Sequence, residues 1–141
     1  MCGISVYVSK KNLSKKLLSS LKSIHHRGPD FSDYKTLKTN QYYTGLGHAR
    51  LSIVDLTETG NQPMVSRNQK YIMVYNGELY NTDFLKKKLG KFSFRGTSDS
   101  EVLLEYFTYF GVKGFSDLRG MFAVIFYNVE NGEIIALRDH L

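Results

Sequence analysis

Cys2 is the residue of this chain best suited to nucleophilic chemistry, because its type and its position act together. A small residue after an initiator methionine normally allows the methionine to be removed, which would leave one residue carrying both a thiol and a free α-amino group. A free cysteine has a pKa of about 8.5 and an α-amine a pKa of about 7.7 to 8, so both groups titrate near physiological pH. An N-terminal amine can act as the base for its own side-chain nucleophile, and Gly3 leaves room for a substrate beside the thiol. We therefore predict a cysteine nucleophile here, in preference to a cysteine that only packs as a small apolar side chain.

Three further stretches carry side chains that could take part in chemistry. Adjacent histidines in residues 25–30 (HHRGPD) suggest a metal site, but no third ligand stands at a useful spacing, and we predict a loop organised by Arg27 and Asp30 without a metal. Asn76-Gly77 is usually a hairpin turn, yet a helical pattern follows it. Asp99 stands at the start of a helix, where the helix dipole alone could account for it, so a structural and a functional interpretation are both open.

The apolar pattern predicts the elements that must hold these residues in place. We expect strands over residues 4–8, 42–48, 51–56, 71–75, 121–127 and 133–138, and helices over residues 13–24, 82–89 and 98–110. Asn12 is a plausible N-cap of the first helix, and Ser98 with Glu101 fits a capping box on the last. The last two strands should form a hairpin. Strands and helices do not alternate in a strict βαβ series, so the predicted class is α+β with largely antiparallel sheets.

Composition and charge exclude several classes of protein. The 141 residues, of which 42% are hydrophobic, allow one domain with a real core, and one cysteine rules out an intramolecular disulfide framework. The formal charge of +6 comes from short lysine runs at helical spacing, which indicates solvated helix faces, and no nucleic-acid motif accompanies them. There is neither an apolar run of membrane-spanning length nor a signal-peptide pattern. We predict no nucleic-acid or membrane partner and, because the thiol must stay reduced, a cytoplasmic location.

These residues resemble a class II glutamine amidotransferase domain, the N-terminal nucleophile hydrolase module of glutamine-hydrolysing asparagine synthetases. The resemblance covers essentially the whole chain. It rests on a series of motifs in order: residues 1–4 (MCGI), 26–30 (HRGPD), 47–55 (GHARLSIVD), 62–64 (QPM), 75–81 (YNGELYN), 97–99 (TSD), 118–123 (LRGMFA) and 138–139 (RD). The arginine segment followed by Gln-Pro is the asparagine synthetase form of the pattern.

The resemblance implies a role for each residue of a glutaminase site. Cys2 would attack the side-chain amide of glutamine and form a γ-glutamyl thioester, while the side chain of Asn76 and the backbone N–H of Gly77 would stabilise the oxyanion. Arg50 would bind the α-carboxylate of glutamine, and Asp99 its α-ammonium. The pocket would be completed by Leu51, Ile53 and Glu78.

The resemblance also implies a fold and its limits. We expect the four-layer αββα sandwich of antiparallel sheets typical of N-terminal nucleophile hydrolases, lacking its last strands, because in this family the Arg-Asp of residues 138–139 continues into more strands. Residues 1–141 would be an incomplete glutamine amidotransferase type-2 domain, with the synthetase domain absent. The glutaminase step needs no cofactor or metal, whereas ATP and Mg²⁺ would belong to the missing synthetase domain or subunit that receives the ammonia. The alternatives are a non-catalytic truncated fragment and the glutaminase part of another amidotransferase, for instance in surface-polysaccharide biosynthesis.

Overall fold

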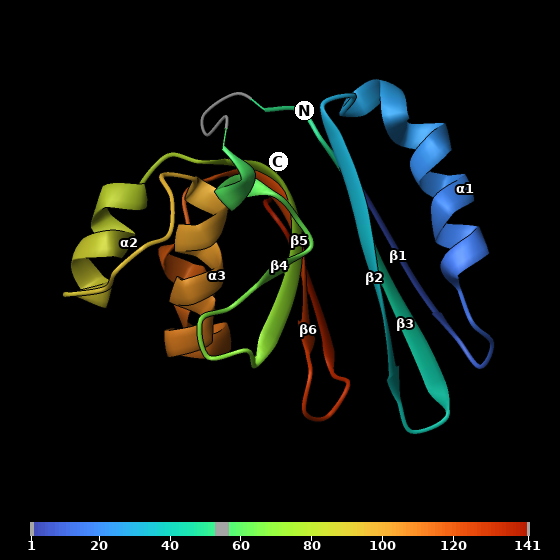
Figure 1. Cartoon of the computed structure of the whole chain (residues 1–141). Helices are drawn as coiled ribbons and strands as arrows, with labels where there is room; N and C mark the ends of the chain where they lie inside the picture. Colours follow the sequence, from blue (N-terminus) through green and yellow to red (C-terminus); the bar gives the residue numbers. More distant parts are fainter. Residues whose placement is uncertain (1, 53–56, 141) are drawn as a thin grey trace.

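Two β-sheets lie face to face in this chain, and each is covered on its outer side by helices (Figure 1). The computed structural model describes residues 2–52 and 57–140. The layers run helix, sheet, sheet, helix, and all neighbouring strands are antiparallel. The predicted α+β class and four-layer αββα arrangement are therefore confirmed. The predicted loss of the last strands concerns sequence beyond this chain and stays a prediction.

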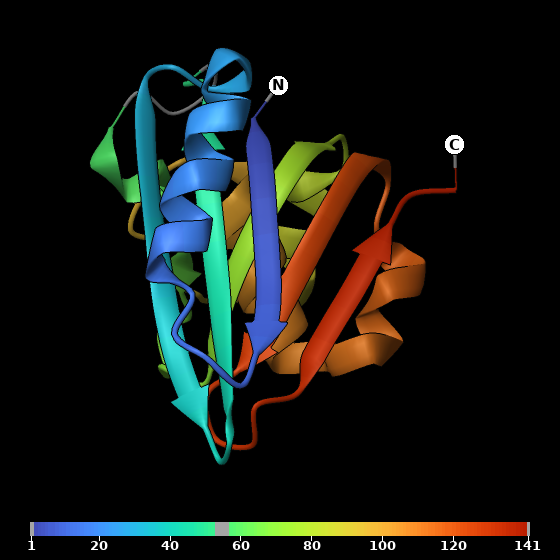
Figure 2. The same cartoon turned by 90° about the vertical axis from the view of Figure 1, so that its right-hand side faces the viewer.

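The first sheet positions Gly3 beside the end of its central strand. Its strands, in spatial order, are β1 (Gly3–Ser9), β3 (Tyr42–Arg50) and β2 (Phe31–Thr39). Helix α1 (Ser14–Ile24) covers the outer face of this sheet (Figure 2). Gly45 of β3 permits the close contact, because a side-chain carbon there would lie 2.3 Å from Leu17 of α1. Alternate side chains of β3 therefore point away from α1, into the space between the sheets.

The second sheet carries the other half of the core. Its strands, in spatial order, are β4 (Met64–Val65), β5 (Tyr71–Leu79), β6 (Gly120–Asn128) and β7 (Ile134–Arg138). Helices α2 (Thr82–Leu89) and α3 (Asp99–Phe110) cover its outer face (Figure 1). Phe107 of α3 stacks on Phe126 of β6 with ring centroids 3.9 Å apart. Between the two sheets Leu46, Ile72, Val74 and Tyr127 form a buried apolar cluster.

Most of the predicted elements are present. The predicted helix over residues 82–89 matches α2, and the predicted terminal hairpin is formed by β6 and β7. Ser98 caps α3, since its Oγ accepts the N–H of Glu101 at 3.3 Å. The Glu101 half of the capping box is wrong, because its carboxylate instead accepts the backbone N–H groups of Arg95 and Gly96 at 2.9 Å. This carboxylate thereby fixes the loop that leads into α3.

Other elements differ from the prediction. Strand β2 was not predicted, and Asn76-Gly77 lies inside β5 rather than at its end. Leu51 and Ser52 are outside any strand, and residues 53–56 of that predicted strand lie outside the described residues. The N-cap position of α1 is Leu13 rather than Asn12, although Asn12 Oδ1 still accepts the N–H of Ser14 at 2.9 Å. The described part of the chain also contains three short 3-10 helices, η1 (His25–Arg27), η2 (Glu58–Gly60) and η3 (Gly111–Asp117).

Within residues 2–52 and 57–140, no helix is long and apolar enough to cross a membrane.

Candidate active site

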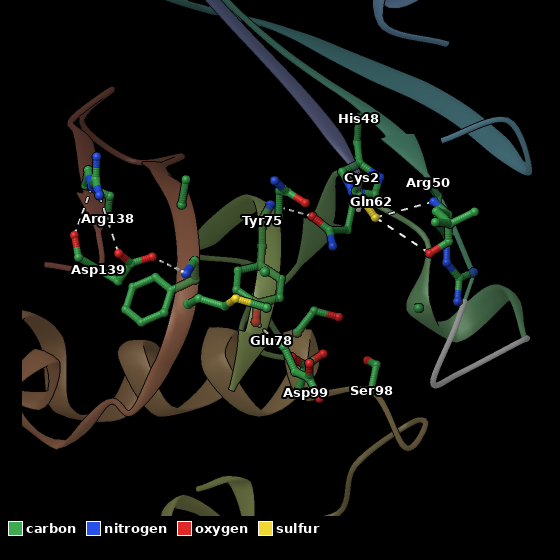
Figure 3. Close-up of a pocket in the computed structure, with 18 residues that line it drawn as sticks. Cys2, His48, Arg50, Gln62, Tyr75, Glu78, Ser98, Asp99, Arg138 and Asp139 are labelled. Atoms are coloured by element: carbon green, nitrogen blue, oxygen red, sulfur yellow. Dashed lines mark hydrogen bonds and ion pairs between the residues drawn. The ribbon is translucent and has the colours of Figure 1, made fainter. Parts of the chain in front are cut away.

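A cavity of about 430 Å³ lies where the ends of the two sheets meet (Figure 3). Its walls come from the residue before β1, the end of β3, the second half of β5, the start of α3, the start of β6 and the end of β7. Seven of the eight predicted site residues line it: Cys2, Arg50, Leu51, Asn76, Gly77, Glu78 and Asp99. The eighth, Ile53, lies outside the described residues. The fold thus brings these seven predicted residues together around one cavity.

The thiol of Cys2 is held against the main chain that follows β3. The N–H of Leu51 donates to Cys2 Sγ at 3.4 Å, and Sγ–H donates to the Leu51 carbonyl at 3.7 Å. On the other side Arg27 Nε donates to the Cys2 carbonyl at 3.2 Å. These contacts fix both the side chain and the backbone of the residue at the mouth of the cavity.

The loop over residues 25–30 has the organising role that the sequence predicts. Besides the Arg27 contact, Asp30 Oδ2 accepts the N–H of Ser52 at 2.7 Å, while the Asp30 N–H donates to the Arg50 carbonyl at 3.1 Å. His25 and His26 are exposed on η1. In the part of the chain that the structure describes, no group of three His, Cys, Asp or Glu side chains could hold a metal ion.

Arg50 ends β3 with its guanidinium held by the following loop. Nη1 donates to the Thr57 carbonyl at 2.7 Å and to Asn61 Oδ1 at 2.6 Å, and only 7% of the residue is exposed. Gly60 is needed for this arrangement, because a side-chain carbon there would lie 2.4 Å from Arg50 Nη2. A planar cation fixed at one end of a cavity is a suitable partner for a carboxylate.

Asn76 and Gly77 present polar groups from the middle of a strand pair. They pair with Ala123 and Phe122 of β6, and a side-chain carbon at residue 77 would lie 2.4 Å from the Met121 carbonyl. Only glycine fits so near a neighbouring backbone. Asn76 Oδ1 is buried and has no hydrogen bond to any described residue. Buried polar groups are nearly always satisfied, so this oxygen is available to accept a hydrogen bond from a ligand in the cavity.

Asp99 lies across the cavity from Cys2 and Arg50 (Figure 3). Its Oδ2 accepts the hydroxyl of Tyr75 at 2.8 Å and the N–H of Leu79 at 3.0 Å. The carboxylate therefore has a task beyond the helix start, because it bridges α3 to β5. Together with Glu78, which is exposed at the same rim, it gives this wall a negative charge.

His48 and Tyr75 also line the cavity, although neither is predicted as a site residue from the sequence. His48 is fully buried, and neither ring nitrogen makes a hydrogen bond of ordinary geometry to a described residue. Burial lowers its pKa to about 4, with a smaller lowering from the Arg50 charge and a partial opposing effect of the Tyr75 backbone. The imidazole is therefore neutral at physiological pH. Nothing in the surrounding glycine-rich strand marks His48 as a site residue, because a histidine on the buried face of a strand is indistinguishable in sequence from a core residue.

The low pKa of His48 makes folding stability depend on pH. The ordinary value is 6.5 and the folded value about 4, so between these two pH values the unfolded state binds the proton and the folded state does not. Stability should therefore fall as pH decreases through this window, by about 3 kcal/mol from this residue. We expect His48→Gln to remove this part of the pH dependence, measured by urea unfolding at pH 7 and pH 4.

The exposed His26 of η1 provides the matched control. His26→Gln should leave the pH profile of unfolding like that of the wild type. Parallel profiles for wild type and His48→Gln would contradict the buried, neutral imidazole.

Comparison with known proteins identifies the family of this chain. The family model described as a glutamine amidotransferase domain matches residues 1–141. The chain is 36% identical over 158 residues to amidase chry2 of Gibberella zeae, covering 99% of this chain and 22% of the relative. It is 34% identical over 157 residues to a putative glutamine-hydrolysing asparagine synthetase of Methanocaldococcus jannaschii, covering 100% and 30%. It is 34% identical over 146 residues to asparagine synthetase B of Escherichia coli, covering 100% and 26%.

The chain thus spans between 22% and 30% of the length of these relatives, and the family model covers the residues that line the cavity. This chain belongs to the glutamine amidotransferase family, over residues 1–141.

Proposed function

We propose that this chain hydrolyses glutamine to glutamate and ammonia, with Cys2 as the nucleophile. The observation that carries the proposal is the placement of a thiol, a guanidinium and a carboxylate around one cavity of about 430 Å³. Free glutamine has an amide, an α-carboxylate and an α-ammonium, and these three groups complement Cys2, Arg50 and Asp99. A site that contacts both ends of a free amino acid separates a glutaminase from a general amidase.

The reaction would proceed through a thioester on Cys2. Removal of Met1 would expose the α-amine of Cys2, which would take the thiol proton as Sγ attacks the amide carbon. The tetrahedral intermediate carries an oxyanion, which the Asn76 side-chain amide and the Gly77 N–H would stabilise. Collapse of the intermediate would break the C–N bond, and the amine would give its proton to the departing ammonia. Water would then attack the γ-glutamyl thioester and release glutamate.

The remaining polar groups would bind the substrate. Arg50, held by Thr57 and Asn61, would bind the α-carboxylate, and Asp99 would bind the α-ammonium. Glu78 at the same rim would add to the attraction for the ammonium, while Leu51 and Ile53 would complete the wall beside the thiol. No step of this half-reaction requires a cofactor or a metal.

The ammonia would serve a synthetase domain or subunit that uses ATP and Mg²⁺. Several relatives are named glutamine-hydrolysing asparagine synthetases, which supports aspartate as the acceptor of the complete enzyme. Two fungal relatives named amidases, 36% and 34% identical, favour another acceptor as the second candidate. Formation of asparagine from aspartate, ATP and glutamine by the chain with its synthetase partner would separate the two. A nucleophilic thiol that must stay reduced is in keeping with a cytoplasmic location.

Labelling with 6-diazo-5-oxo-norleucine tests the glutaminase proposal directly. This glutamine analogue keeps both α-substituents and alkylates an activated nucleophile with loss of N₂. We expect the intact mass to show a chain without Met1 that gains one equivalent of the analogue less N₂, on the peptide that contains Cys2. Excess glutamine should slow the labelling. A chain that lacks Met1 but gains no adduct would overturn the proposal and favour a non-catalytic fragment.

A further inference from the structure

Tyr75 is a buried polar side chain in the cavity to which the glutaminase reaction assigns no task. It lies on β5 with 3% of its surface exposed, and its hydroxyl donates to Asp99 Oδ2 at 2.8 Å. Figure 3 shows Tyr75 and Asp99 on the same side of the cavity, apart from Cys2 and Arg50. The phenol therefore contacts the carboxylate proposed to bind the α-ammonium, and it lies away from the reacting thiol.

The two donors to Asp99 reach the same oxygen. Oδ2 accepts both the Tyr75 hydroxyl and the N–H of Leu79, which lies at 3.0 Å. Across residues 2–52 and 57–140, Oδ1 makes no hydrogen bond, so one carboxylate oxygen is fixed and the other is left for a ligand. Two donors from β5 define the plane of the carboxylate, whereas one donor would leave it free to rotate.

Tyr75 is itself held rigidly. Its backbone N–H donates to Gln62 Oε1 at 2.6 Å, and its backbone pairs with Val124 of β6. Burial, followed by the charge and the hydrogen bond of Asp99, raises the pKa of Tyr75 far above its ordinary value. The hydroxyl therefore keeps its proton at every working pH and remains a donor to Asp99.

We propose that Tyr75 is a positioning residue that aims Asp99 at the α-ammonium of the substrate and so sets the preference of the site for an α-amino acid. This proposal rests on the glutaminase function above. Without the hydroxyl, the carboxylate keeps only the Leu79 donor and loses its fixed plane. Binding of the ammonium then weakens, while attack on the amide by Cys2 is unaffected.

The test compares glutamine with glutaramate, the same molecule without the α-ammonium. For Tyr75→Phe we expect kcat/KM for glutamine to fall about tenfold or more, mainly through KM, because a hydrogen bond to a charged group is lost. For glutaramate kcat/KM should stay within about twofold of the wild type, since that substrate has no group for Asp99 to bind. Combined with Asp99→Asn, the Tyr75→Phe substitution should add little, because the two residues act as one unit.

Tyr71 of the same strand supplies the matched control. Its ring packs edge-on against Phe107, with centroids 4.9 Å apart, and Tyr71→Phe should leave both substrates unchanged. Tyr75→Phe keeps the buried ring and removes only the hydroxyl, so it should fold, and its urea unfolding midpoint measured beside that of the wild type checks this.

An equal loss for both substrates in Tyr75→Phe would overturn the positioning role while leaving the glutaminase function intact. Wild-type protein that neither turns over glutamine nor reacts with the diazo analogue would overturn both. The two failures are therefore distinguishable in one set of measurements.

Discussion

Cys2→Ala is expected to abolish glutamine hydrolysis, with kcat falling by at least about a thousandfold. The variant removes the only cysteine of the chain, and with it the atom that would form the thioester. The backbone of Leu51 defines the position of this sulfur, which lies 3.4 Å from the Leu51 nitrogen and 3.7 Å from its carbonyl oxygen. Release of glutamate from glutamine, measured with a coupled dehydrogenase assay, gives the rate.

Cys2→Ser is the matched variant for this prediction. It keeps a nucleophile of similar shape and the contacts with Leu51, but its hydroxyl is a far weaker nucleophile at neutral pH, so it too should be nearly inactive. Both variants should unfold at the wild-type urea midpoint to within a few tenths of a molar unit, since a half-exposed thiol contributes little to the core. Retention of a tenth of the wild-type kcat in Cys2→Ala would mean that another group attacks the amide.

The elements that the sequence predicts well are those with strong local signals. Helix α2 carries a terminal glycine at Gly90, and α3 has Ser98 as a side-chain cap and an apolar face that includes Leu103 and Phe107. The β6–β7 hairpin is recognised from two apolar stretches around an Asn-rich turn. In each case a few neighbouring residues decide the local conformation, so one sequence is enough.

The missed elements depend on partners far away in the chain. Strand β2 has mostly exposed, polar residues, because it is an edge strand that pairs only with β3, and no apolar alternation marks it. Asn76-Gly77 has the local preference of a turn, but pairing with Ala123 and Phe122 of β6 keeps both residues extended. Tertiary pairing therefore overrides the local signal at the residues that we propose to bind the oxyanion.

The candidate site was predictable as a set of motifs, but its supporting residues were not. His48 and Tyr75 sit in stretches that read as apolar strand, and only the stacking of two sheets shows that they face the cavity. Gly60 likewise lies in a sequence typical of a turn, whereas the structure shows that its lack of a side chain makes space for the guanidinium of Arg50. The sequence motifs indicate the candidate catalytic and binding residues. The side chains that orient them can be identified only from the packing of the folded chain.

Asn76→Ala is expected to lower kcat for glutamine by a hundredfold or more, with KM within about threefold of the wild type. The amide would act on the oxyanion, which exists only after attack, so its loss raises the barrier without weakening ground-state binding. Stability should change little, because Asn76 Oδ1 makes no hydrogen bond to the described residues and β5 keeps its pairing with β6. Steady-state kinetics with urea unfolding measures the two effects on the same preparation.

Asn81 is the matched control, because we expect its replacement to lower stability while activity is retained. Its Nδ2 donates to the Asp117 carbonyl at 2.8 Å and its Oδ1 accepts the N–H of Arg119 at 3.0 Å, so it joins the end of β5 to the loop before β6. Asn81→Ala should therefore cost about 1 to 3 kcal/mol of unfolding free energy while kcat stays near the wild-type value. An Asn76→Ala variant that loses stability and activity together, as a structural asparagine would, contradicts the oxyanion role. The two asparagines are five residues apart in one motif. Comparing their variants therefore distinguishes an asparagine that stabilises the transition state from one that stabilises the fold.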